Sequence, residues 1–198
     1  MLIGKPESQR NFDPAPQGGK ALTLCDVVDL GEVETDWGAK DMLRLHYITP
    51  DTFQNDDGDA QHFMVVERCT KSLYDGSGKS PNPSKLYTRI TSLTGAGPQY
   101  NSDGQFDVET LLGKSAFANI VHSEPNDKGA VWANIQSMMP LPAEIAAPLI
   151  PTNFVRSKDR EPKPDQQQQK RDDWATGNKD GEPQGVEEPT WASEELPL

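Results

Sequence analysis

Apolar and polar residues alternate over several stretches of this chain, and that alternation is typical of half-buried β-strands. The clearest stretch is MLRLHYIT, residues 42–49. Proline has no N–H to give to a strand ladder, so Pro50 is expected to end this strand. The two predicted faces carry Leu43, Leu45 and Tyr47 on one side and Arg44, His46 and Ile48 on the other.

Four further stretches have the composition and spacing of strands. A long first strand is expected over residues 20–33, bent near Asp26 and broken by Gly31. Later strands are expected over 61–70, 114–124 and 130–142, the last two around a turn at 125–129. The polar segments 34–41, 54–60 and 75–84 are predicted to be turns and loops.

The spacing changes in one segment, SKLYTRITSLTG (84–95), where Leu86, Ile90 and Leu93 recur at intervals of four and three. That spacing indicates a helix, which Gly95 would end. Residues 106–114 predict one further short helical turn.

The predicted order is therefore three strands, a helix and two strands. Five antiparallel strands in this order are typical of the OB-fold, a small five-stranded barrel. A β-sandwich is the alternative, and it would need more strands than the pattern supplies.

Composition divides the chain into three parts. Residues 1–19 are a leader rich in proline and glycine, and residues 20–150 hold most of the β-branched and aromatic residues of the expected OB domain. Residues 151–198 are rich in Pro, Gln, Asp, Glu and Lys, which predicts a disordered linker with an acidic tip. This tail explains why only 34% of the chain is hydrophobic.

Charge is distributed as unevenly as hydrophobicity. The net charge is -12, and residues 180–198 contain six Asp and Glu but no Lys or Arg. An acidic chain repels nucleic acid at long range, so nucleic-acid binding would need a local basic or aromatic surface.

The sequence predicts a soluble, cytoplasmic protein. No apolar run is long enough to span a membrane, and the N-terminus lacks the apolar stretch of a signal peptide. Cys25 and Cys69 stand in apolar strands, which favours small buried side chains over a zinc site.

Motifs for catalysis are not found. The glycine clusters match neither the P-loop nor the dinucleotide fingerprint, and the three histidines fall on three separate predicted strands. Asp56, Asp57 and Asp59 resemble part of a calcium loop but lack its terminal glutamate. We therefore expect no enzyme activity, no metal and no cofactor.

A binding surface is the more plausible site. An OB barrel binds nucleic acid on strands two and three and on the loops joining strands one–two and four–five, with aromatic rings on bases and cations on phosphates. Phe63 and Tyr47 are assigned to the core, Trp37 could instead cover the barrel, and Arg44 and Arg68 could be ordinary solvated side chains. The candidate residues are Trp37, Lys40, Arg44, His46, His62, Arg68, Lys71, Tyr74 and Lys128.

The end of the chain has its own pattern, with apolar residues dispersed among carboxylates. This composition suits docking into a basic, hydrophobic groove on another protein. The residues of this candidate partner-binding tip are Trp191, Glu194, Glu195, Leu196, Pro197 and Leu198.

An OB-like domain, a Pro/Gln-rich linker and a tip ending EELPL together resemble the single-stranded DNA-binding proteins of bacteria and their phages. The segments RNFDPAPQGG, DVVDLGEV and LLGKSAFANIVH resemble phage-encoded OB proteins in a general way. In those families the tip recruits replication and repair enzymes and competes with DNA. The chain departs from the bacterial pattern in having Leu198 where phenylalanine is usual.

Two hypotheses follow. The first is a phage-type protein that coats single-stranded DNA during replication or recombination in the host cytoplasm, recruits partner proteins through its tip, and is compatible with homo-oligomerisation. The second is an acidic adaptor or inhibitor that imitates DNA and binds a host protein, supported by the net charge of the predicted domain.

Overall fold

The computed structural model describes residues 13–36, 38–55, 58–75, 82–127 and 129–160. The long strands are β1 (Gly18–Thr35), β2 (Gly38–Gln54), β3 (Ala60–Thr70), β6 (Ser115–His122) and β7 (Ala133–Pro140). The shorter elements are β4 (Tyr74–Asp75), β5 (Asn82–Pro83), the helix α1 (Lys85–Thr94) and two 3-10 helices, Val108–Leu111 and Ser157–Asp159.

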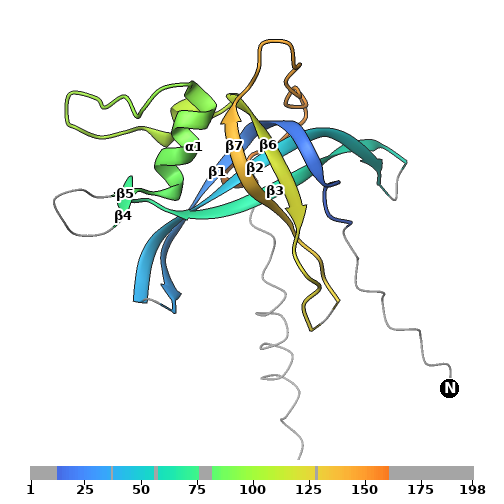
Figure 1. Ribbon diagram of the computed structural model, residues 1–198, viewed down its shortest axis with the longest axis horizontal. Helices are drawn as coiled ribbons and strands as arrows, with labels where there is room; N and C mark the ends of the chain where they lie inside the picture. Colours follow the sequence, from blue (N-terminus) through green and yellow to red (C-terminus); the bar gives the residue numbers. More distant parts are fainter. Residues whose placement is uncertain (1–12, 37, 56–57, 76–81, 128, 161–198) are drawn as a thin grey trace, which may run out of the picture. The chain divides into compact units, whose positions relative to one another are not determined.

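The long strands form an antiparallel sheet in the order β3-β2-β1-β6-β7, and α1 packs against β3, β6 and β7 (Figure 1). The predicted mostly-β fold, with a helix between the third and fourth long strands, is confirmed. The edge strands β3 and β7 lie next to each other. Within the described residues no hydrogen-bonded ladder joins them, so the sheet curves toward a barrel without closing.

Two irregularities allow β1 to run farther than predicted. The register with β2 shifts between Leu24 and Asp26, which confirms the expected bend. It shifts again between Asp29 and Gly31, where Gly31 has a positive φ of 63° and its N–H bonds to Asp29 Oδ1 at 2.8 Å. Gly31 therefore does not break the strand as predicted, because a β-bulge absorbs its left-handed conformation.

The strand β2 is also longer than predicted, and Pro50 does not end it. Pairing with β3 is irregular between Ile48 and Thr52 and then resumes to Gln54, because the bulge accommodates a residue without an N–H. At its other end β2 pairs with β1 as far as Gly38 opposite Thr35. Most of the predicted turn 34–41 is thus strand, and residues 29–42 form a hairpin arm that projects from the sheet (Figure 1).

The helix α1 begins and ends where its sequence indicates. The Ser84 side chain accepts a hydrogen bond from the Tyr87 N–H at 3.2 Å, and Gly95 ends the helix in the left-handed conformation. Its buried face packs on the core with Tyr47, which is fully buried, and with the partly buried Phe63. Cys25 and Cys69 are buried free thiols, as predicted.

The compact unit extends to Arg160, beyond the expected linker boundary. Residues 148–160, called the strap here and drawn in orange, return to β1 (Figure 1). Thr23 Oγ1 donates to the Pro148 carbonyl at 2.7 Å, and Asp26 Oδ2 accepts from the Ser157 N–H at 2.7 Å. Residues 161–198 lie outside the described part of the chain. No helix among the described residues has the length and apolar composition to cross a membrane.

Candidate functional site

One face of the sheet formed by β1, β2 and β3 carries four of the seven predicted DNA-binding residues that the structure describes. Residues paired directly across antiparallel strands share a face, so the register places His46 between Asp26 and Val66, and Arg44 between Val28 and Arg68. Continuing along the hairpin arm, Lys40 pairs with Val33 on the same face. This surface, the outer face, comprises Asp26, Val28, Val33, Lys40, Met42, Arg44, His46, Val66 and Arg68.

Arg44 and Arg68 stand directly opposite each other on the outer face. Like charges in this position destabilise a sheet, so the pair is not explained by stability. Neither arginine has an ion pair with another described residue, and Arg44 Nε is buried without a hydrogen-bond partner. The positive charges of this pair are therefore not neutralised by any carboxylate of the described residues.

His46 adds a second unsatisfied group next to Arg44. Its Nε2 is buried and has no hydrogen-bond partner in the described structure. Burial lowers the pKa of His46, and the positive charge of Arg44 lowers it further. The lowered pKa favours the neutral imidazole at pH 7.

Asp26 is the carboxylate of the outer face, and it is almost fully covered, with 1% of its surface exposed. Arg156 Nε lies 3.1 Å from its Oδ1. Burial raises the pKa of Asp26, but hydrogen bonds from Ser157 and Arg156 lower it below its ordinary value overall. The negative charge on this face is consequently neutralised by the strap.

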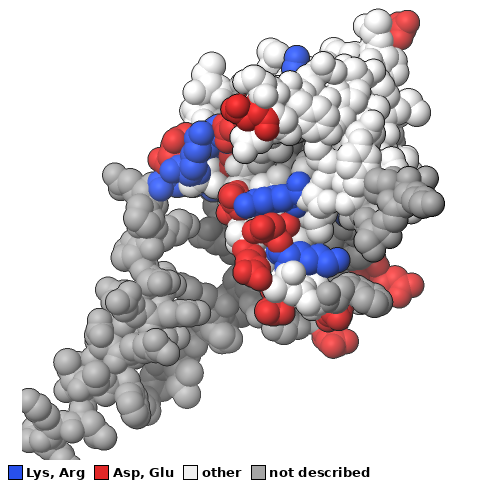
Figure 2. All heavy atoms as spheres, turned by 90° about the vertical axis from the view of Figure 1, so that its left-hand side faces the viewer, with Lys and Arg blue, Asp and Glu red and all other residues white. Residues whose placement is uncertain are grey.

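The carboxylates of the hairpin arm lie on the opposite face, called the inner face because it continues into the core. Glu32 pairs with Asp41, and Glu34 pairs with Ala39, one position out of phase with Val33 and Lys40. Lys71 also belongs here, since its Nζ bonds to Asp29 at 2.7 Å and lies 3.8 Å from Asp41. Figure 2, which views the protein from the left-hand side of Figure 1, shows Lys and Arg side chains interleaved with Asp and Glu side chains.

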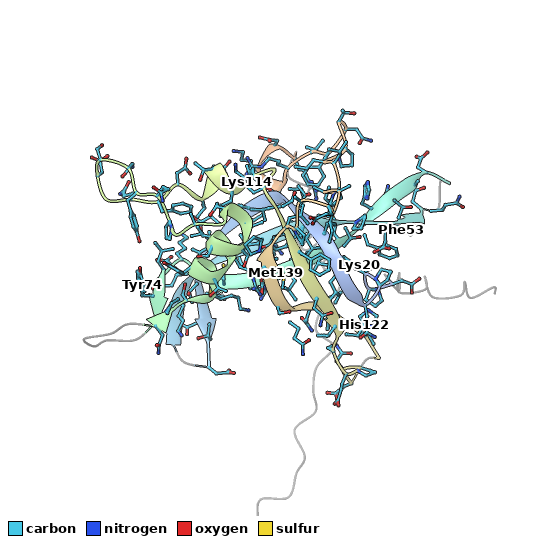
Figure 3. All side chains as sticks on the ribbon, turned by 45° about the horizontal axis from the view of Figure 1, so that its top comes forward. Lys20, Phe53, Tyr74, Lys114, His122 and Met139 are labelled. Carbon is cyan, nitrogen blue, oxygen red and sulfur yellow. The ribbon has the colours of Figure 1, made fainter. Side chains whose placement is uncertain are left out.

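Two other predicted residues, His62 and Tyr74, lie away from the cations Lys40, Arg44 and Arg68 of the outer face. His62 Nδ1 is 2.7 Å from the Thr49 carbonyl, toward the far end of β3. Tyr74 stacks on Tyr87 of α1 with ring centroids 5.4 Å apart, away from Phe53 on the β2–β3 hairpin (Figure 3). The predicted residues outside the described part of the chain are Trp37, Lys128, Trp191, Glu194, Glu195, Leu196, Pro197 and Leu198.

Sequence reasoning missed Trp132, the residue just before β7. Its side chain is 62% exposed, and its N–H bonds to Ser123 Oγ at 3.0 Å across the β6–β7 hairpin. An aromatic residue in the last hairpin of an OB-like order was a usable signal, because that loop belongs to the expected binding surface. Met139 on β7 is also exposed (Figure 3).

The two buried cysteines have unreactive thiols. Burial, the largest cause, raises the pKa of the Cys25 thiol to about 12 and that of Cys69 to about 11, so both stay protonated at neutral pH. No group of three metal-ligating side chains occurs among the described residues. What the outer face offers is guanidinium groups, a neutral imidazole and apolar side chains.

Comparison with known proteins does not assign the chain to a family. No protein-family model and no curated protein matches it.

Proposed function

We propose that this protein binds single-stranded DNA without sequence preference, on the outer face of β2 and β3. The observation that carries the proposal is the separation of charge: Lys40, Arg44 and Arg68, which form no ion pair with a described residue, share one face, while the carboxylates of the arm lie on the other. An acidic protein needs such a local basic surface to hold a polyanion.

The chemistry of the outer face suits a nucleic-acid strand. The opposed guanidinium groups of Arg44 and Arg68 match phosphate oxygens, which accept charge-assisted hydrogen bonds. Val66 is 44% exposed beside them and offers an apolar surface for a sugar or base. Trp132, exposed on the β6–β7 hairpin, offers a further aromatic ring for stacking on an unpaired base. Contacts of this kind read no base edges, so they predict binding that tolerates any sequence.

The test is a fluorescence-anisotropy titration of the full chain with an oligo-dT strand and with a duplex of equal length. We expect the single strand to bind more tightly at low salt. If Lys40, Arg44 and Arg68 each neutralise one phosphate, log K should fall with log[salt] with a slope of about -2. Equal affinity for the duplex, or no binding at low salt, would contradict the proposal.

The resemblance to phage single-stranded DNA-binding proteins extends the proposal to the tail. We infer that the acidic tip, with Trp191 and residues 194–198, recruits replication or recombination proteins. If the tip also competes with DNA for the outer face, removing residues 190–198 should raise the affinity for oligo-dT. An unchanged affinity would argue against that competition.

A second candidate function is supported by the inner face, where Asp29, Glu32, Glu34 and Asp41 gather on one side of the arm. An acidic surface of this kind could imitate DNA and occupy the binding site of a host protein. This hypothesis expects no DNA binding by the full chain and a stable protein complex. Replacing Glu32 and Glu34 by glutamine should then abolish the complex.

A further inference from the structure

We propose that the end of the strap, residues 156–160, is a third element of the DNA-binding face and that Arg160 contacts the phosphate backbone beside His46. The inference rests on the proposed function and deepens it. It concerns a segment whose composition predicts a disordered linker, so sequence analysis placed no site residue there.

The strap is fixed to the sheet next to His46. Arg156 donates to both carboxylate oxygens of Glu109, at 2.6 and 2.8 Å, and its Nε donates to Asp26. The Ser157 N–H bonds to the other oxygen of Asp26. Asp26 is the direct cross-strand partner of His46, so the strap backbone lies over the row of the outer face that contains His46.

The two following cations of the strap differ in their surroundings. Lys158 Nζ lies 3.4 Å from Glu109 Oε2, so its charge is directed toward the 3-10 helix Val108–Leu111. Arg160 is exposed, its Nε donates to the Val155 carbonyl at 3.1 Å, and it has no ion pair with any described residue. Its charge is close enough to contribute to the lowered pKa of His46.

These positions place cations on two sides of His46. Arg44 stands two residues before His46 on the same face of β2. Arg160 stands three residues after Ser157, which bonds to Asp26 of β1. A strand crossing from the strap to β3 would meet Arg160 and then the pair Arg44 and Arg68. An extended nucleic-acid backbone carries a phosphate at every nucleotide, so such a path predicts one more neutralised phosphate than β2 and β3 alone provide.

The experiment compares Arg160→Ala with Lys158→Ala in the full chain, by anisotropy titration with oligo-dT at several salt concentrations. Lys158 is the matched control because it has the same charge and lies two residues away on the same strap. We expect Arg160→Ala to weaken binding about five- to tenfold and to reduce the magnitude of the salt slope by about 0.7. Lys158→Ala should change the affinity less than twofold.

The outcomes separate this inference from the function on which it rests. If the unmodified protein does not bind oligo-dT, the proposed function fails. If it binds but Arg160→Ala keeps the same slope, or both variants lose affinity equally, the role of Arg160 is refuted. Arg160→Lys should recover most of the slope, because it restores the charge, and the unfolding temperature of Arg160→Ala should not change.

Discussion

The two faces of the β1–β2–β3 sheet have opposite charge and opposite degrees of pairing. On the outer face Lys40, Arg44 and Arg68 have no carboxylate partner in the described structure, and Asp26 is neutralised by Arg156. On the inner face Glu67 is buried against Arg89, with two hydrogen bonds of 2.7 Å. A net charge of -12 therefore does not determine the charge of a local surface, because strand alternation places cations and carboxylates on different faces.

The presence or absence of an ion-pair partner also distinguishes charges that stabilise the fold from charges that the proposed function assigns to DNA binding. Removing one member of a buried ion pair leaves an uncompensated charge in the interior. Removing an unpaired surface cation removes only its repulsion with neighbours. The two faces should therefore respond to mutation in opposite ways.

The largest expected effect is on stability and comes from the inner face. Arg89→Met should lower the free energy of unfolding by about 3–5 kcal/mol, because it leaves the Glu67 carboxylate buried without its partner. Urea unfolding followed by circular dichroism measures it. Lys85→Met is the control, since Lys85 Nζ lies 3.5 Å from Glu67 and is half exposed, and it should cost less than about 1 kcal/mol. Equal losses for both variants would contradict this assignment.

The next largest effect is on the affinity for DNA and comes from the outer face. Replacing Arg44 and Arg68 together by glutamate should weaken oligo-dT binding more than about 100-fold, since two charge-assisted contacts become repulsive. Single Arg44→Ala should leave stability unchanged or raise it by about 0.2–1 kcal/mol, because the opposed like charges are separated.

The matched control for this prediction is Glu32→Gln with Glu34→Gln on the inner face of the arm. It removes two charges from the adjoining β1–β2 hairpin arm and should raise oligo-dT affinity only about twofold. That rise should vanish near 0.15 M salt, where the Debye length is about 8 Å. A comparable response from the two faces would show that overall charge, and not its placement, governs binding.

The smallest expected effect is the pH response of the strap that covers Asp26. Hydrogen bonds from Arg156, and then from Lys158, lower the pKa of Glu109 from 4.5 to about 2. A carboxylate with a lowered pKa stabilises the fold above its unfolded pKa, so this contribution is present above about pH 4.5 and is lost as the pH falls toward 2. A carboxyl titration of Glu109 by NMR measures it, and a midpoint near 4.5 would mean that the ion pair is absent in solution.

Local patterns predicted much of the fold. The alternation of residues 42–49 separated Arg44 and His46 from the core residues Leu43 and Tyr47, as the burial of β2 confirms. Ser84 and Gly95 bound the predicted helix because capping depends on neighbouring residues only. Gly31 and Pro50 misled the prediction, since each is accommodated by a bulge that depends on the partner strand.

Long-range pairings could not be predicted in this way. Arg156 lies in a polar segment without periodicity, yet it is held by Asp26, 130 residues earlier in the chain. Arg89 occupies the buried side of α1 because Glu67 of β3 neutralises it. The local sequence of neither arginine indicates its partner, so residues 151–160 of the strap were predicted to be linker.

The bulge between Asp29 and Gly31 sets the phase of everything that follows it in β1. If Leu30 were instead paired in a regular ladder, the alternation that directs Asp26 and Val28 outward would continue to Glu32 and Glu34, and both carboxylates would lie on the same face as the arginines. One unpaired residue thus shifts the alternation of β1 by one position and decides which side of the arm carries its carboxylates. A chain with Leu30 paired in the ladder would keep its composition and its net charge while reversing which side of the hairpin attracts an anion, whereas deletion of Leu30 would leave both sides as they are.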